Sequence, residues 1–341
     1  MKLKNLGFLT LLTLALVSCD VEEGTNTPKN SSNLEVDLQE DPASFITKWE
    51  IPSHNFELTI GVQTELSYHF VIDWGDGAVE NLSNLTENPT HTYTKSGTYL
   101  VAITGDFPAI SMYNVTNELE STSSFQSQKA LVGIYQWGAI EWETFEYGFY
   151  NADLSEYKAA DLPDLSNVAN MESMFYSTNF NGDIGDWDTS NITNMDNMFS
   201  FAFTFNQDIS NWDTSNVTTM EGMFASWDSN YKTQFNQDIS GWNVGNVSNF
   251  RSMFVLSKFN KNLASWDISS ATSMDSMFNL SSMSIENYSN TLIGWAAQNV
   301  QPDVPLGAMY NHHNCTASDA KETLETNGWT FQDLGPDQDC Q

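Results

Sequence analysis

The sequence predicts a mostly β protein with short helices: a small β-sandwich, then a solenoid of repeats, then a helical C-terminal cap. Three observations predict this fold class. A strand-rich segment surrounds a turn signal, DWGDG, at residues 73–77. A long phrase recurs with small changes between residues 171 and 278. After residue 285 the phrase stops, and two helical patterns replace it.

The strand-rich segment is expected to form a domain over residues 43–107. FELTIGV, LSYHFVIDWGDG and GTYLVAITG alternate or cluster apolar residues over strand lengths. In DWGDG the glycines can take positive φ and the aspartates can hydrogen-bond the backbone, as turns require. This turn and HTYTKSGTYLVAI at 91–103 resemble the two signatures of PKD-type β-sandwich domains. The resemblance implies that the WGDG turn and His91 are structural.

The repeats are expected to fill residues 108–285, beginning with a divergent unit at 131–154. The pair Met-Phe recurs at intervals of 24, 25, 30 and 24 residues: Met174-Phe175, Met198-Phe199, Met223-Phe224, Met253-Phe254 and Met277-Phe278. An insertion at 225–234 explains the longest interval. Because one turn cannot bury its large apolar groups alone, stacked turns must bury each other's faces. We interpret SNVTTM (215–220) as a short strand and MEGMF (220–224) as the start of a helical turn.

The repeated phrase, FNxDISxWDTSNVTxMxxMF, resembles the repeat of BspA-like leucine-rich-repeat surface proteins. Tryptophan keeps step with it at Trp187, Trp212, Trp242 and Trp266. The resemblance implies a secreted or surface-anchored protein. It also implies adhesion as a role, since several members of that family are implicated in adhesion to host proteins or to other cells.

Residues 286–341 are expected to cap the solenoid, whose last turn would otherwise expose an apolar face and an open strand edge. Helical patterns lie at 289–298 and 318–327, and Ser318 precedes the second as a predicted N-cap. Cys315 and Cys340 both lie in this segment. Because export would place them in an oxidising compartment, we predict a disulfide between them; the alternative is two free buried thiols.

The chain begins MKLKNLGFLTLLTLALVSC, a short positive region followed by an apolar run too short to span a bilayer comfortably. The run ends in LVSC, which resembles the bacterial lipobox. The resemblance implies a signal peptide at 1–18 and lipidation of Cys19; an ordinary cleaved signal peptide is the alternative. The residues after Cys19 up to 42 are polar and contain no aromatics, so we predict that 19–42 is the acylated cysteine and a flexible tether. The next residues, CDVEEG, resemble the export signal of Bacteroidetes surface lipoproteins. They imply an outer-membrane, surface-exposed protein of such a bacterium.

The charge balance excludes two classes of partner. Lys and Arg number 12 against 44 Asp and Glu, which gives a formal net charge of −32. Nucleic acids and anionic lipid headgroups are therefore not expected as ligands, because both need a basic surface. The membrane is expected to be reached only through the anchor at Cys19.

The sequence contains no HExxH spacing, no GxSxG elbow and no phosphate-binding glycine loop. We therefore predict a protein that is not an enzyme and needs no cofactor. The alternative is glycan binding or processing by the aromatic and acidic segment 137–150. Glu141 and Glu143 stand there beside Trp137 and Trp142, as acids and aromatics do in a glycosidase cleft or sugar platform. The simpler interpretation is a first solenoid turn with its aromatics inside and its acids outside.

Stacked turns would bring equivalent residues to about the strand spacing of 4.8 Å. Two columns of acids would follow, one of Asp183, Asp208 and Asp238 and one of Asp188, Asp213 and Asp267. Calcium could bridge such carboxylates. Asn replaces Asp once in each column, at Asn262 and Asn243, and both residue types cap turns. Backbone hydrogen bonding is therefore the simpler interpretation, and calcium is the alternative.

Together these patterns predict a surface-anchored bacterial lipoprotein that presents a repeat solenoid for protein or cell-surface binding. The exposed Asn, Thr, Ser and Asp side chains of the repeats are the expected ligand surface. The 225–234 insertion is the expected specificity loop, since binding residues concentrate on loops held by a rigid frame. A purely architectural role in the envelope is a third hypothesis.

Overall fold

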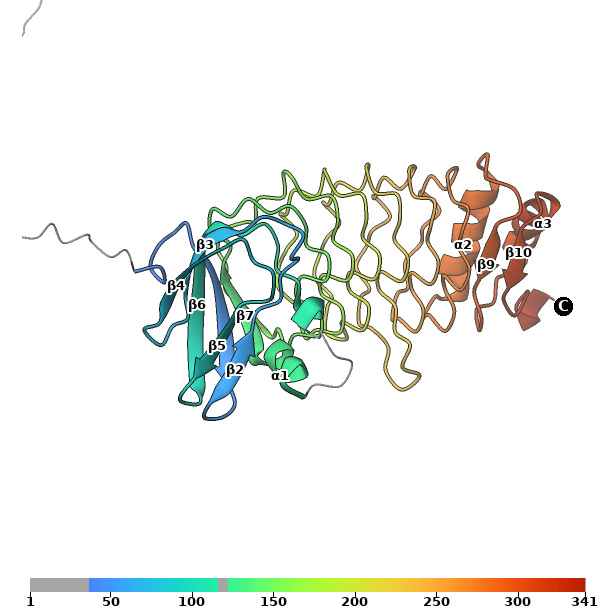
Figure 1. Ribbon diagram of the computed structural model, residues 1–341. Helices are drawn as coiled ribbons and strands as arrows, with labels where there is room; N and C mark the ends of the chain where they lie inside the picture. Colours follow the sequence, from blue (N-terminus) through green and yellow to red (C-terminus); the bar gives the residue numbers. More distant parts are fainter. Residues whose placement is uncertain (1–36, 116–121, 341) are drawn as a thin grey trace, which may run out of the picture. The chain divides into compact units, whose positions relative to one another are not determined.

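The computed structural model describes residues 37–115 and 122–340. Residues Asp37–Gln341 form one compact unit. As predicted, the fold is mostly β with a few short helices (Figure 1). The predicted signal peptide at 1–18, the lipidation site Cys19 and most of the predicted tether at 19–42 lie outside the described residues.

The N-terminal strands form a six-stranded sheet and a two-stranded sheet. The larger sheet has the order β4-β3-β6-β1-β7-β8 and is antiparallel except for its β7–β8 pair. Its strands are β1 (Phe45–Ile51), β3 (His69–Asp73), β4 (Val79–Ser83), β6 (Gly97–Asp106), β7 (Leu131–Gln136) and β8 (Glu156–Tyr157). The smaller sheet pairs β2 (Phe56–Thr59) with β5 (Thr90–Tyr93). Because β7 and β8 follow residue 107, the larger sheet continues into the first repeat.

Contacts inside these sheets hold the WGDG turn between β3 and β4. His91 Nε2 lies 2.9 Å from Asp76 Oδ2, and its ring stacks on Trp74 with 5.0 Å between centroids. Gly75 has φ +82°, and a Cβ there would lie 2.3 Å from the Leu100 carbonyl oxygen. Only glycine fits such a position. The turn and His91 therefore serve the structure.

The repeats stack turn upon turn between the sheets and the C-terminal segment (Figure 1). Parallel bridges join equivalent residues of successive turns along the series Asn170, Asn194, Thr219, Asn249 and Ser273. Inside, phenylalanine rings form a stacked column with 5.6–5.8 Å between centroids: Phe149, Phe175, Phe199, Phe224, Phe254 and Phe278. The tryptophans also link turns, since the indole N–H of Trp242 donates to the Ile209 carbonyl at 3.0 Å. Each turn thus completes the core of its neighbour.

The segment MEGMF forms a single hydrogen-bonded turn, in which the Met223 N–H donates to the Met220 carbonyl at 3.3 Å, but no helix follows it. Met220, Gly222 and Phe224 donate their N–H groups to carbonyls of the next turn at 2.8–3.0 Å. Every second residue thus bonds the next turn, and a residue with left-handed backbone makes this possible. Here that residue is Gly222, with φ +61°. In other turns a non-glycine residue takes the same conformation, as Ser173 does with φ 55°. Stacking between turns therefore overrides the local helical preference.

The C-terminal segment continues the stack before ending it. Its elements are α2 (Ile285–Ala296), β9 (Pro305–Gly307), η2 (Cys315–Ala317), α3 (Ser318–Thr326), β10 (Thr330–Gln332) and η3 (Gln338–Cys340). Trp295 of α2 donates its indole N–H to the Leu263 carbonyl at 3.0 Å, as the repeat tryptophans do. The last repeat also donates to this segment, from Phe278 N–H to the Gly307 carbonyl at 2.8 Å. These contacts cover the final turn.

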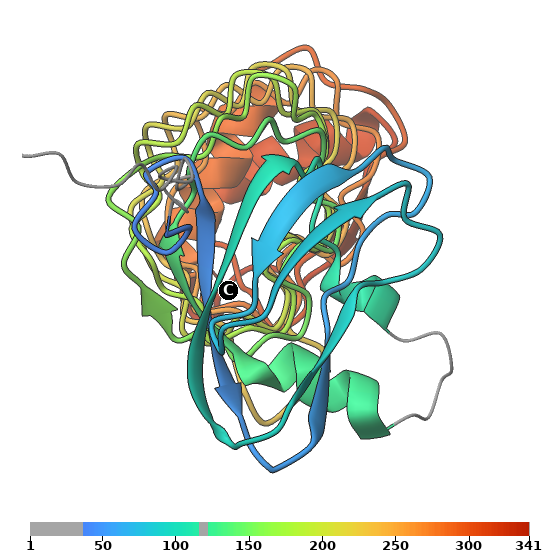
Figure 2. The ribbon, with the colours of Figure 1, turned by 60° about the vertical axis from the view of Figure 1, so that its left-hand side comes forward.

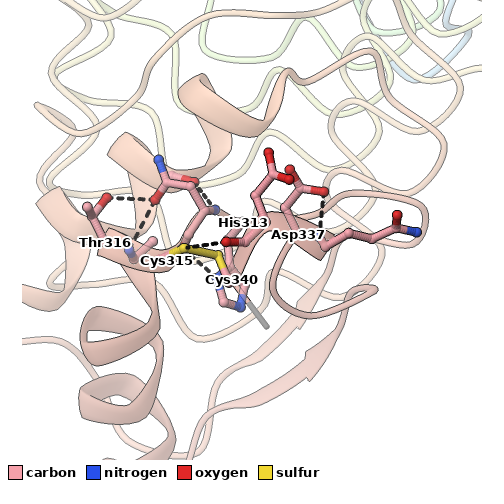
Figure 3. Close-up of a disulfide and its surroundings, with 10 residues drawn as sticks. His313, Cys315, Thr316, Asp337 and Cys340 are labelled. Carbon is pink, nitrogen blue, oxygen red and sulfur yellow. Dashed lines mark hydrogen bonds between the residues drawn. A yellow bond between two sulfur atoms is a disulfide. The ribbon is translucent and has the colours of Figure 1, made fainter.

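Cys315 and Cys340 form the predicted disulfide (Figure 3). The predicted N-cap at Ser318 is wrong, because Ser318 is the first residue of α3. The capping side chain is Asn314, which accepts the Ala317 N–H at 3.2 Å at the start of η2. In the described part of the chain, no helix is long and apolar enough to cross a membrane.

Candidate functional site: an aromatic row along the repeats

The aromatic and acidic segment 137–150 places its tryptophans inside and its acids outside. Trp137 and Trp142 are fully buried, and the Trp137 indole N–H donates to the Tyr157 hydroxyl at 3.0 Å. Glu141 and Glu143 are exposed. A sugar platform needs an open aromatic face. These two indoles offer none, because both are in the core.

The aspartates of the two predicted columns accept hydrogen bonds within their own turns. In each, Oδ1 accepts the backbone N–H two residues later, at 2.9–3.3 Å: Asp183, Asp188, Asp208, Asp213, Asp238 and Asp267. Hydrogen bonds from the serine two residues later lower the pKa of Asp188, Asp208, Asp213, Asp238 and Asp267. We call these six residues the turn aspartates. Across residues 37–115 and 122–340, no group of three or more His, Cys, Asp or Glu side chains is placed to hold a metal.

A polar hollow of 760 Å³ lies beside β8 and is lined by residues 154–162, 180–183, 186 and 207. Two of its acids are already bonded. Glu156 pairs with Lys48 Nζ at 2.5 Å and accepts the Tyr135 hydroxyl at 2.6 Å. Asp161 accepts the backbone N–H groups of residues 137 and 138 at 2.8–3.1 Å. These bonds fasten the sheet to the first repeat, so the hollow belongs to the structural frame.

Seven aromatic rings in mutual contact run along the repeats, and we call them the aromatic row. Neighbouring ring centroids lie 4.7–6.0 Å apart. The row consists of Tyr113, Tyr147, Tyr150, Tyr176, Phe201, Phe203 and Tyr231. Its end members are 47% and 62% exposed, and the five between them are half-buried. The row is therefore a continuous, partly exposed apolar surface and not part of the core.

The repeat geometry explains why these rings meet. Tyr150 and Tyr176 each directly follow a core phenylalanine, so they occupy equivalent places in successive turns and stack at 4.7 Å with 7° between planes. In the next turn the equivalent residue is the buried Ser200. Phe201, the next residue, continues the row instead, with its ring centroid 5.3 Å from that of Tyr176. The row cannot be recognised in the repeated phrase, because its members are not one residue type at one place of the repeat.

Burial raises the pKa of three tyrosine hydroxyls of the row, those of Tyr147, Tyr150 and Tyr176. Burial, followed by the charge of Glu172, raises the pKa of Tyr147 to about 12. Burial raises that of Tyr150 to about 12 as well. The Tyr147 hydroxyl donates to Glu172 Oε1 at 3.1 Å. The row thus combines apolar rings with hydrogen-bond donors, which is the composition that interfaces favour.

Two projecting elements bound the row. Helix α1 (Thr122–Ala130) and the 225–234 insertion project from the same side of the stacked turns (Figures 1 and 2). Tyr113 of η1 (Met112–Val115) ends the row near α1, and Tyr231 of the insertion ends it at the other side. Lys232 holds the insertion in place by donating to the Ser281 carbonyl and the Ser282 hydroxyl at 3.1 Å.

Comparison with known proteins gives one family match. Residues 143–232 and 229–304 each match the family model described as "Mycoplasma protein of unknown function, DUF285". The two matches meet within the insertion, so this part of the chain consists of repeats that the family model also describes. No curated protein matches the chain. No solved structure matches it either.

Proposed function

We propose that this protein is a lipid-anchored, non-enzymatic surface protein that binds proteins or cell surfaces through its repeats. In this proposal the repeats are a solenoid of the BspA-like leucine-rich-repeat kind, and the N-terminal sheets are a PKD-like domain. Cys19 bears the anchor, in the outer membrane of a Bacteroidetes-like bacterium. The family match supports the repeats, and the Cys315–Cys340 disulfide supports an oxidising compartment.

The observation that carries the binding role is the aromatic row. Scattered exposed apolar residues are ordinary on a protein surface, whereas a contiguous apolar stretch marks an interaction site. Tyrosine adds a large, rigid contact area with a polar end, and aromatic residues are enriched at protein interfaces. Seven such rings follow one another on a frame of stacked turns. This arrangement suits an elongated ligand better than a small molecule.

The test compares adhesion of three forms of the full chain to arrays of extracellular proteins and glycans. The forms are the wild type, the double variant Tyr150→Ala/Tyr176→Ala, and the control Tyr310→Ala. Tyr310 is 65% exposed and lies outside the row. We expect the wild type and the control to bind the same array members and the double variant to lose at least about tenfold in affinity. Thermal unfolding of each form verifies the fold.

The outcomes separate the hypotheses. Binding to proteins that survives Tyr310→Ala but not the double variant supports the proposal. Binding only to glycans would replace it by the glycan alternative. If the wild type binds no member of any array, the adhesion role is overturned and an architectural role is favoured. Repeating the assay with calcium and with EDTA tests whether the turn aspartates matter to binding.

The anchor needs its own test, because Cys19 lies outside the described residues. The full chain is expressed in a Bacteroidetes host that is supplied with a labelled fatty acid, alongside Cys19→Ser. We expect label and membrane association in the wild type and neither in the variant. An unlabelled wild type in the soluble envelope fraction would indicate an ordinary cleaved signal peptide.

A further inference from the structure

A second row accompanies the aromatic row, and it is made of carboxylates. Each of four successive turns places one acid at the same point, and these four residues are the carboxylate row: Glu146, Glu172, Asp196 and Glu221. The backbone aligns them, because the N–H of the residue after each acid donates to the carbonyl of the next acid or its equivalent at 2.7–2.9 Å. Neighbouring members are therefore separated by about one strand spacing, roughly 4.8 Å at the backbone.

The two rows run along the same turns. Glu146 and Tyr150 belong to one turn, Glu172 and Tyr176 to the next, and Asp196 precedes Phe201 in the third. Because stacking keeps equivalent residues aligned, the two rows run in parallel over the turns of Tyr150 and Tyr176.

A direct contact ties the rows together at their start. The Tyr147 hydroxyl of the aromatic row donates to Glu172 Oε1 at 3.1 Å. A ligand lying on the ring of Tyr147 therefore also meets the carboxylate of Glu172.

The carboxylate row carries unbalanced charge. Burial raises the pKa of Glu146, and the charges of Glu172 and Glu65 raise it further. Burial also raises the pKa of Asp196, against the hydrogen bonds from the Thr219 hydroxyl and the Glu221 N–H, and the charges of Glu221 and Glu172 add to the rise. Within the described part of the chain, no ion pair reaches Glu146, Glu172 or Asp196. A cation at this row would relieve repulsion that the fold itself leaves in place.

The protein's own sequence shows what the row accepts. In the fifth turn the equivalent residue is Arg251, and its guanidinium lies 3.9 Å from both Glu221 and Asp275. A basic side chain thus lies over the end of the row, between the acids of two neighbouring turns. The first three members have no such partner among the described residues.

We propose that the aromatic row and the carboxylate row together bind an extended, Lys- and Arg-rich polypeptide segment of another protein. The inference rests on the proposed binding function and names the chemical class of its partner. Lys and Arg side chains lay their aliphatic stems on apolar surface while their charged heads reach polar groups. Here the stems lie along the rings and the heads reach the carboxylates.

Other occupants fit less well. A second copy of this chain brings 44 acidic residues against 12 basic ones, so like charges would meet. A sugar needs an open ring face, whereas Tyr150 and Tyr176 cover each other's faces at 7° between planes. An acidic peptide would add to the repulsion along the row. A basic segment alone satisfies both rows at once.

The experiment titrates the purified full chain with three labelled peptides of equal length. One alternates Lys or Arg with Leu, one replaces the basic residues by Glu, and one replaces them by Ser. We expect measurable binding of the basic peptide only. Because exposed charges are screened by salt, we expect affinity to fall about tenfold or more between about 0.05 M and 0.5 M salt. Equal binding of the Ser or Glu peptide would overturn the inference.

Matched charge variants distinguish a built site from general attraction to an acidic protein. Glu146→Gln/Asp196→Asn removes two charges from the row, and Asp208→Asn/Asp213→Asn removes two from the turn aspartates. Each Asp→Asn change retains the Oδ1 acceptor that bonds the backbone. We expect the first pair to weaken binding of the basic peptide about tenfold and the second to change it less than about twofold. Equal losses would mean attraction to net charge and would overturn the site.

The aromatic arm completes the test. Tyr150→Ala/Tyr176→Ala is expected to lower the affinity for the basic peptide at high salt as well as at low salt, since salt does not screen contact with the rings. An unchanged affinity would overturn the role of the rings. If the wild type binds its array proteins but no basic peptide, the inference fails while the proposed function stands. If it binds neither, both fail.

Discussion

Asp196 and Asp213 belong to consecutive units of the repeats, yet their carboxyl groups experience opposite surroundings. Asp213 is exposed, and hydrogen bonds from the Ser215 hydroxyl and N–H lower its pKa. Asp196 is half-buried, and burial raises its pKa even though it accepts the Thr219 hydroxyl and the Glu221 N–H at 2.5 and 2.6 Å. One carboxylate is stabilised by its own turn, while the other lies among like charges.

This difference separates structural acids from candidate functional ones. The turn aspartates repeat because each turn needs an acceptor for its own backbone, and Asn replaces Asp there without loss of that role. The carboxylate row bonds the following turn instead: Glu172 accepts the Asn194 amide at 3.2 Å and Glu221 the Asn249 amide at 2.9 Å. Among the described residues, its first three members have no cationic partner. The row consists of three glutamates and one aspartate, and Arg251 follows it in the fifth turn. Residues that oppose local stability are expected at functional sites.

The largest effect should come from the core that supports both sets of acids. Phe224 is fully buried, with the rings of Phe199 and Phe254 on either side at 5.8 Å. Phe224→Ala should lower the free energy of unfolding by about 3–5 kcal/mol, through lost burial and a cavity. Urea unfolding measures it, and Tyr176→Ala in the half-buried row serves as the comparison. A loss for Phe224→Ala no greater than for Tyr176→Ala would mean that the turns do not depend on the phenylalanine column.

A smaller effect should follow from removing one turn aspartate. Asp213→Ala deletes the acceptor of the Ser215 N–H, a bond of 2.9 Å. We expect a loss of about 0.5–1.5 kcal/mol, the usual net contribution of one hydrogen bond. Asp213→Asn keeps the acceptor and should lose much less. If the two substitutions destabilise equally, the carboxylate charge matters more than the turn, and the calcium alternative gains support.

The sequence predicted the architecture because the architecture repeats. The Met-Phe period, the tryptophans in step and the insertion at 225–234 all describe one turn that needs neighbours, and the structure stacks those turns. Asx hydrogen bonding by Asp208 and Asp213 was also predictable, since Asp and Asn share that ability. MEGMF forms one turn and no helix, because a left-handed residue and hydrogen bonds between turns decide its conformation.

The candidate site was not predictable in the same way. Trp137 and Trp142 drew attention because they are large and stand beside acids, yet both are buried. Tyr150 and Tyr176 lie close by in sequence and reach the surface instead. Residues at their place in the repeat are Tyr, Ser, Ala and Val in successive turns. A comparison of the repeats therefore shows no preferred aromatic residue there. Only stacking reveals that Phe201 and Phe203 continue the row.

The smallest expected effect is the change that Asp196→Asn makes to the free energy of unfolding as a function of pH. It is also the most direct test of the difference between Asp196 and Asp213. The folded-state pKa of Asp196 lies above its unfolded value of about 3.9, so its contribution to stability is fully present below that value and is lost as pH rises through the folded pKa. The amide keeps the Oδ1 acceptor but never ionises. At pH 7 the variant should therefore be more stable than the wild type, by under about 1 kcal/mol. The two should converge near pH 4.

Asp213→Asn provides the opposite sign. Because the folded-state pKa of Asp213 is lowered, its stabilising contribution is present above about pH 3.9 and is lost as pH falls through the folded pKa. Unfolding of both variants by urea at pH 7, at pH 4 and at a pH below the folded-state pKa of Asp213 measures the difference. An Asp196→Asn protein less stable than the wild type at pH 7 would show that Asp196 is another turn acid. The carboxylate row would then need no cationic partner to balance it.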